Sequence, residues 1–333
     1  MDLAAINSHD SWSPLQEVWL GDVYPASWYD HLESEIRDIF YLLTEITQQD
    51  LATIQQVLIE MDITVRRPSY HSIDAFLDQH DQLIKPAICP RDNNLVIGNR
   101  LIRTPLQGAD PWQKWIDLYR QDTRVSIEDA AAMCVCGANV VRAGRDIIVD
   151  RDGSTAYHYH NEWPEHRVKV IDNGGHLDGC FAIIKPGLIL ANHYFADYQE
   201  TFPGWEIIML DNPTYGAAPS TGHRQKFPIY NGKFWDTTVG TNRSFNQHII
   251  DHALDWVGMY TETYFELNCL VIDERNVLML AENDFLAETL AQHDVNVHWV
   301  PFRSRCFWDG AVHCLTVDIR RNSTIKDYFP GRA

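Results

Sequence analysis

Positive charge is scarce in this chain of 333 residues, which has 27 Lys and Arg against 46 Asp and Glu and a formal net charge of −19. No basic tract offsets this acidity, so the composition argues against non-specific binding to nucleic acid or anionic membranes. Long hydrophobic runs are absent too, since none reaches the roughly 20 residues of a membrane helix. We therefore expect neither nucleic acid nor membrane as a partner, and the acidity suits either a cationic substrate or an ordinary solvated surface.

A secretory signal is also missing, because the opening residues MDLAAINSHD have neither a basic region nor an apolar core. The seven cysteines are odd in number. Without a signal, this count favours reduced thiols over a disulfide framework. The expected location is cytoplasmic.

Nucleotide-binding motifs are absent, since no GxGxxG follows a strand pattern and no GxxxxGK[ST] occurs. This weakens a Rossmann or P-loop assignment. No low-complexity segment or Pro/Gly/Ser-rich linker divides the chain, so we predict a single domain over residues 1–333.

What the sequence does contain is a repeated pattern. Residues 269–302 read as strand, turn, strand, amphipathic helix and strand, and residues 181–211 read in the same way. Partial copies occur at residues 94–105 and 51–68. The repeats predict an α/β fold of about five pseudosymmetric ββαβ units packed around an axis, with a two-domain α/β enzyme as the alternative. In such an array, polar residues at the ends of inner strands face the axis.

Two segments place carboxylates at such strand ends. CPRDNNLVIGN has Asp92 just before a strand that begins near Leu95, where an aspartate can also simply cap a turn. VIDNGGHLDGCF has His176 and Asp178 between glycines. In an extended backbone these two side chains would point the same way and line one wall; the alternative is a solvated hairpin.

A third segment, WDGAVHCLTVDIRR, places Cys314 where a glycine turn gives way to an apolar strand. A thiol needs a positive or hydrogen-bonding neighbour to become a nucleophile. His313 would point away in an extended segment, so His176 is the candidate partner. The alternative is a buried cysteine with only a packing role.

Two further clusters contain metal-ligand residue types. Cys134 and Cys136 are separated by one residue, and residues 157–160 read Tyr-His-Tyr-His. Neither has the second ligand pair at the spacing of a zinc site, so no metal is predicted.

Together these segments resemble the glycine amidinotransferase family of the pentein, or guanidino-group-modifying, superfamily. The resemblance spans most of the chain and is carried by SWSPLQEVWLGDV, CPRDNNLVIGN, VVRAGRDIIV, GGHLDGCF and VHCLTVDIRR with the downstream STIKDYF. It implies a fivefold pentein-type α/β propeller that needs no cofactor. It also implies a small-molecule guanidino donor and an amine acceptor as partners, and is compatible with a homodimer.

The same resemblance implies roles for individual residues. Cys314 would be the nucleophile and His176 the general acid/base. Asp92 and Asp178 would hold the guanidinium, whose planar, forked N–H donors suit opposed carboxylates. Asn139 would stand at a further substrate-binding position.

The chain departs from the family pattern in two places. Where the family has the acidic partner of its histidine, this chain has Cys136, and a second family acid is replaced by Asn139. Glu128 or Asp129 could substitute if the loop shifts. After GLILAN the family has an arginine that grips the substrate carboxylate, whereas HYFADY offers His193.

The leading hypothesis is therefore an amidinotransferase that moves an amidino group from a guanidino donor, with L-arginine favoured, to an amine through an amidino-cysteine. The alternatives are a guanidine hydrolase of the deiminase or dihydrolase kind, and a catalytically weakened binding protein of the same fold.

Overall fold

Five three-stranded sheets form the framework of the computed structural model, which describes residues 4–104, 109–130, 136–150, 165–171, 176–192, 197–210, 242–257, 265–280 and 282–332. In every sheet the first two strands run antiparallel and the third runs parallel to the second. The sheets are β15 (Thr316–Arg321), β1 (Leu15–Leu20) and β2 (Thr64–Arg66); β3 (Asn94–Ile97), β4 (Arg100–Arg103) and β5 (Ser126–Asp129); β6 (Val140–Ala143), β7 (Asp146–Asp150) and β8 (Arg167–Ile171); β9 (Phe181–Lys185), β10 (Leu188–Ala191) and β11 (Glu206–Met209); and β12 (Leu270–Asp273), β13 (Asn276–Met279) and β14 (Asn296–Trp299).

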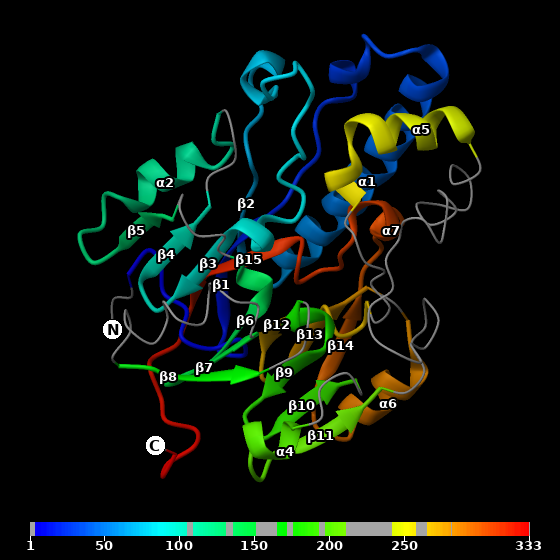
Figure 1. The fold of residues 1–333 in the computed structure, drawn as a ribbon. Helices are drawn as coiled ribbons and strands as arrows, with labels where there is room; N and C mark the ends of the chain where they lie inside the picture. The colour runs from blue at the N-terminus through cyan, green and yellow to red at the C-terminus, as the bar shows by residue number, and fades with distance from the viewer. Residues whose placement is uncertain are drawn as a thin grey trace.

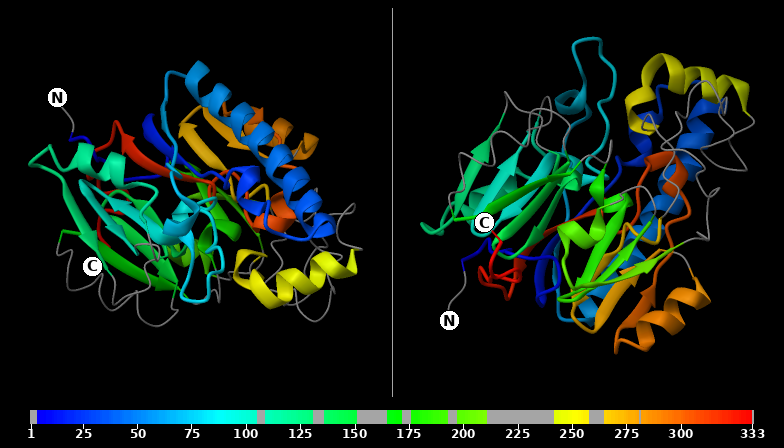
Figure 2. Two further views of the ribbon diagram at one scale, coloured as in Figure 1. Left: turned by 90° about the horizontal axis from the view of Figure 1, so that it is seen from above. Right: turned by 60° about the horizontal axis from the view of Figure 1, so that its bottom comes forward.

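Among the described residues, four of the sheets have a helix between their second and third strands, as the repeat pattern predicts (Figures 1 and 2). The longest, α1, buries Phe40, Leu51, Ile54 and other residues spaced three or four apart, so one face packs on the core. The helices are α1 (Ser34–Glu60), α2 (Gln113–Tyr119), α4 (Tyr198–Thr201), α5 (Arg243–His252), α6 (Asp284–Ala291) and α7 (Arg305–Trp308). None of these described helices is both long and apolar enough to cross a membrane.

The two ends of the chain close the ring. β15, near the carboxyl end, pairs antiparallel with β1, near the amino end, with Leu20 opposite Thr316. In Figure 1 the red β15 runs beside the blue β1. The last strand thus supplies the inner strand of the first sheet, and the predicted array of ββαβ units around an axis is confirmed.

Each inner strand is preceded by a short turn, and these turns meet one another. They are the 3-10 turns η3 (Pro90–Asn93), η4 (Gly137–Asn139) and η5 (Leu177–Gly179), and hydrogen-bonded turns at residues 265–268 and 312–315. η3 packs against η4, and η4 against η5. The approach is so close that a Cβ on Gly137 would lie 2.3 Å from the carbonyl oxygen of Asn94. Only glycine fits there.

A buried ion cluster joins three of the sheets beside these turns. Asp318 on β15 is 1% exposed, and its carboxylate accepts hydrogen bonds from Arg91, Arg142 and Arg321. Arg91 also donates to the backbone oxygens of His313 and Thr316, at 3.0 and 2.9 Å. The Asp318 cluster therefore ties η3 and β6 to β15 and fixes the turn before β15.

Candidate active site

The turns at the axis bring the predicted site residues together from distant parts of the chain. Asp92 lies in η3, His176 and Asp178 at η5, and Cys314 in the turn before β15. The charges of His176 and Asp178 are near enough to influence the pKa of Asp92. The strand-end rule thus selected residues that share one site.

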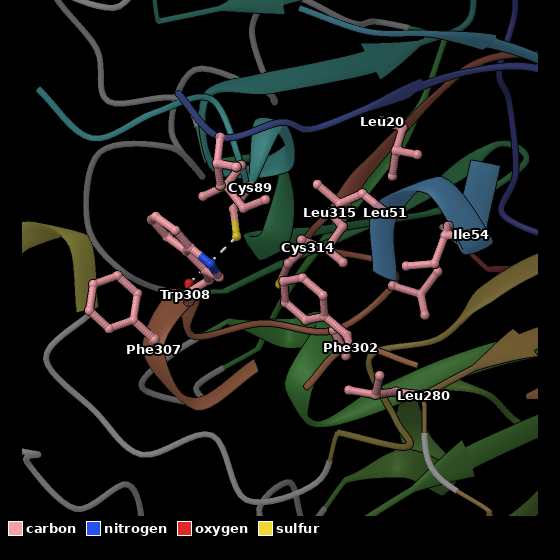
Figure 3. Close-up of a cluster of buried hydrophobic side chains, with 14 of the residues drawn as sticks. Leu20, Leu51, Ile54, Cys89, Leu280, Phe302, Phe307, Trp308, Cys314 and Leu315 are labelled. Carbon is pink, nitrogen blue, oxygen red and sulfur yellow. Dashed lines mark hydrogen bonds between the residues drawn. The ribbon is translucent and has the colours of Figure 1, made fainter. Parts of the chain in front are cut away.

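Cys314 is only 2% exposed and lies in an apolar surround that includes Phe302 and Leu315 (Figure 3). Its Sγ donates to Asp178 Oδ2 across 3.4 Å and accepts from Asn268 Nδ2 across 2.9 Å. Asn268 Oδ1 in turn accepts from the Cys314 amide at 2.9 Å. The thiol is therefore held from two sides.

Asn268, which is fully buried, is a site residue that the sequence reasoning missed. It stands two residues before β12, as Asp92 stands two residues before β3 and Cys314 two residues before β15. The repeat therefore indicated this residue, since a search for polar residues just before the first strand of the repeat at residues 269–302 would have found Asn268.

Neither segment has the extended backbone that was considered from the sequence. Residues Leu177–Gly179 form the 3-10 turn η5. The residues around Cys314 form a turn in which Leu315 N donates to Ala311 O at 3.0 Å and Thr316 N to His313 O at 3.1 Å. The strand begins at Thr316, because the Asn268 side chain caps the amides of Ala311 and Cys314 and keeps this segment compact.

His313 consequently does not point away from the site. Its Nδ1 lies 2.7 Å from Asp178 Oδ2, the same oxygen that the Cys314 thiol contacts. Burial and the charge of Arg91 lower the pKa of His313. The Nδ1 contact of His313 therefore orients the Asp178 carboxylate.

The two site carboxylates differ in how they are stabilised. Burial raises the pKa of Asp92, although the charges of His176 and Lys85 oppose the rise. Burial would also raise the pKa of Asp178, but the hydrogen bond and charge of His313 outweigh it and the pKa is lowered. Each carboxylate has a buried Oδ1 that accepts no hydrogen bond within the described part of the chain.

His176 finds its partner at the position where the sequence lacks the family's acid. Its Nε2 lies 3.5 Å from the Sγ of Cys136. Burial lowers the pKa of His176, but the hydrogen bond and charge of Cys136, with the charges of Asp92 and Asp178, raise it well above its usual value. A thiol thus lies beside His176 at the position where the resemblance implies a carboxylate.

Neither acid suggested as a substitute reaches His176. Glu128 pairs with Arg100 at 2.9 Å and Asp129 with Arg103 at 2.9 Å, both on the β4–β5 edge. Asn139 sits in η4 with a buried Oδ1 that has no hydrogen-bond partner among the described residues. Its amide oxygen is thus available at the axis.

Several residues singled out in the sequence lie outside the described part of the structure. They are Cys134 and Val135, residues 157–160, Gly174 and Gly175, and His193.

Five three-stranded sheets around an axis, with a thiol, a histidine and two carboxylates beside it, have the arrangement of the pentein fold. No protein-family model matches the chain. Among curated proteins, the chain is 24% identical to mitochondrial glycine amidinotransferase of Gallus gallus, over 97% of this chain and 84% of that protein.

Solved structures share the same fold. SxtG, an amidinotransferase from Microseira wollei in the saxitoxin biosynthetic pathway, aligns with a TM-score of 0.70 at 19% identity, over 98% of this chain and 100% of that one. Inosamine-phosphate amidinotransferase StrB1 from Streptomyces griseus gives 0.66 at 17% identity, over 98% and 99%. The N-terminal domain of the cyanobacterial arginine dihydrolase ArgZ gives 0.55 at 13% identity, over 92% and 97%. The resemblance to the amidinotransferase family and the pentein fold are therefore confirmed.

Proposed function

We propose that this chain transfers an amidino group from a guanidino donor, L-arginine, to an amine acceptor through a covalent amidino-cysteine at Cys314. The observation that carries the proposal is the pair of buried carboxylate oxygens, on Asp92 and Asp178, that lack hydrogen-bond partners in the described structure beside a buried thiol. A guanidinium supplies forked N–H donors and a positive charge, so it would satisfy both oxygens.

The residues would act in a balanced sequence. With the guanidinium on Asp92 and Asp178, Cys314 gives its thiol proton to His176, the resulting thiolate attacks the central carbon, and the bond from that carbon to the donor nitrogen breaks. His176 gives a proton to the departing amine, which for arginine is ornithine. The acceptor amine then loses a proton to His176 and attacks the amidino carbon. The carbon–sulfur bond breaks, which restores the thiolate.

Asn268 and His313 would prepare this chemistry. Asn268 donates to the sulfur at 2.9 Å, an interaction that stabilises the thiolate more than the thiol. His313 holds Asp178 Oδ2, so that carboxylate keeps its orientation when the guanidinium displaces the Cys314 S–H from it.

We assign the donor's α-carboxylate to Lys85, since the sequence lacks the family's arginine after GLILAN. Lys85 borders a cavity of about 40 Å³ together with Cys89, Pro90 and Asp92. Its pKa is raised: burial opposes the rise, and the charges of Cys89, Asp92, Asp309 and Asp255 cause it. Lys85→Met should raise KM for arginine and leave KM for agmatine, which has no carboxylate, nearly unchanged.

Intact-mass measurement after incubation with arginine tests the covalent step. Wild-type protein should gain the mass of one amidino group, Cys314→Ala should gain none, and Cys269→Ala should behave as wild type. Burial raises the pKa of Cys269 to about 12, which makes its buried thiol a matched control. No adduct with any guanidine would overturn the enzyme assignment.

Product analysis distinguishes transfer from hydrolysis. Ornithine together with an amidinated acceptor indicates transfer. Citrulline, ammonia or urea formed without an acceptor indicates the hydrolase alternative. We further propose a cytoplasmic location, because the described cysteines are present as thiols; a homodimer stays a prediction.

A further inference from the structure

A carboxylate, a thiol and an imidazole, three groups that can bind a metal ion, lie close together at the axis although they are far apart in the sequence. One carboxylate oxygen of Asp92, the Sγ of Cys136 and one ring nitrogen of His176 all lie within 4.8 Å of one another. The Cys136 Sγ and His176 Nε2 are 3.5 Å apart. Cys136 lacks a second ligand pair nearby in sequence, but the fold supplies its partners from η3 and η5.

This set of atoms matches the coordination chemistry of zinc. Zinc binds thiolate, imidazole and carboxylate ligands at about 2.0–2.3 Å, so ligand atoms of one tetrahedral ion lie roughly 3.5 Å apart. The Cys136–His176 pair already has that spacing. A thiolate and an imidazole also favour zinc over magnesium and calcium, which prefer all-oxygen sites.

A second observation concerns the Asp92 carboxylate, which has an oxygen that a cation, either the substrate guanidinium or a metal ion, would satisfy. The Oδ1 of Asp92 is buried and accepts no hydrogen bond among the described residues. Buried carboxylate oxygens normally have a partner, and a metal ion would provide one.

The described turns that carry the three ligands contact one another. The Asp92 amide donates to the Cys89 oxygen at 3.2 Å, and the Cys180 thiol donates to the His176 oxygen at 3.4 Å.

We propose that Asp92, Cys136 and His176 bind one Zn²⁺ with a fourth position open. The Cys136 thiol releases its proton when the metal binds. Because Asp92 and His176 are also needed for the guanidino substrate, zinc and substrate exclude each other, and the metal holds the enzyme inactive. The inhibition by zinc rests on the proposed function, whereas metal binding itself does not.

Cobalt titration of the chelator-treated full-length protein tests the site without turnover. Co²⁺ should saturate at one ion per chain, show thiolate-to-cobalt charge-transfer absorption, and be displaced by Zn²⁺. Cys136→Ser should abolish that absorption and weaken Zn²⁺ binding more than about 100-fold, since even outer partners of metal ligands are worth 10–100-fold. Cys136→Asp, a second variant, should lose the absorption while still folding around a polar partner of His176.

Cysteine variants elsewhere provide the controls. Cys134→Ser and Cys306→Ser should keep the cobalt spectrum. Absorption that survives Cys136→Ser but disappears in Cys134→Ser or Cys314→Ala would overturn the assignment, as would the absence of saturable binding to the wild type.

The competition is tested separately through the amidino adduct. Zn²⁺ should block adduct formation in the wild type, and at least tenfold more Zn²⁺ should be required in Cys136→Ser. If zinc saturates the site while the adduct forms at an unchanged rate, the inhibitory clause is wrong and the metal site stands. If no adduct forms under any condition, the proposed function fails while the cobalt result still decides the site.

Discussion

The Asp318 cluster and the candidate active site are two buried groups of charges that lie beside one another, and they differ in how fully they are paired. Both carboxylate oxygens of Asp318 bind arginines. In the active site, Asp92 and Asp178 each keep a buried oxygen without a hydrogen-bond partner in the described structure. Fully paired charges hold a fold together, whereas unpaired ones are costly and are kept for a ligand.

Residues adjacent or nearly adjacent in the sequence belong to different clusters. Arg91 binds Asp318 while the next residue, Asp92, faces the active site. On the other side, Cys314 belongs to the site and Asp318, four residues later, to the ion cluster. The pKa values reflect the contrast. Burial would raise the pKa of Asp318, but its arginines hold it well below the usual value; the pKa of Asp92 is raised.

The same Asp→Asn substitution should therefore have opposite effects in the two clusters. Asp318→Asn leaves three buried arginines without their anion and should lower the free energy of unfolding by about 3–5 kcal/mol, a typical loss for a broken buried pair. Asp92→Asn removes an incompletely paired carboxylate and should raise it by about 1 kcal/mol while abolishing adduct formation. Urea unfolding measures both. Equal losses for the two variants would contradict the comparison.

The second largest effect should be a loss of folding stability at low pH, caused by protonation of Asp318. The pKa of Asp318 is depressed in the folded state, so between that pKa and the unfolded value the unfolded chain binds more protons. This part of the stability is fully present above the unfolded pKa of about 4 and is lost as the pH falls through the folded pKa. Urea midpoints of the wild type should show a loss below pH ~4, and Asp92→Asn should show it too. A urea midpoint unchanged down to pH ~3 would contradict a stabilising role of the Asp318 carboxylate.

Much of the site could be predicted from strand ends, because repeats place equivalent positions at one axis. Asp92, Asp178 and Cys314 were selected in this way. The turn at residues 312–315 could not be predicted, since it depends on the Asn268 side chain, which is distant in sequence. For the same reason, local sequence could not place His313 on Asp178 or Cys136 on His176.

Asn268 provides a test of positioning within the active site. Asn268→Ala removes the N–H donor to the Cys314 sulfur and should slow adduct formation by about 100-fold, as the loss of one preorganised donor commonly does. Asn192→Ala is the matched control, because Asn192 is equally buried but donates to the Gly179 oxygen. Rates of Cys314 alkylation by iodoacetamide should fall in the first variant and change less than tenfold in the second. A similar fall in both would mean that general destabilisation, not positioning, is responsible.

Cys136→Asp should have the smallest effect and sharpens the comparison most directly. The substitution gives His176 the kind of charged partner that every arginine of the Asp318 cluster already has. A carboxylate orients a catalytic histidine and stabilises its protonated form, so adduct formation in the presence of a chelator should accelerate, by less than about tenfold. Single-turnover rates with arginine measure it, with Cys136→Ser as the neutral control. If Cys136→Asp is instead slower than Cys136→Ser, a carboxylate does not orient His176 better than a neutral side chain does, and the unpaired state of this site is not what limits its rate.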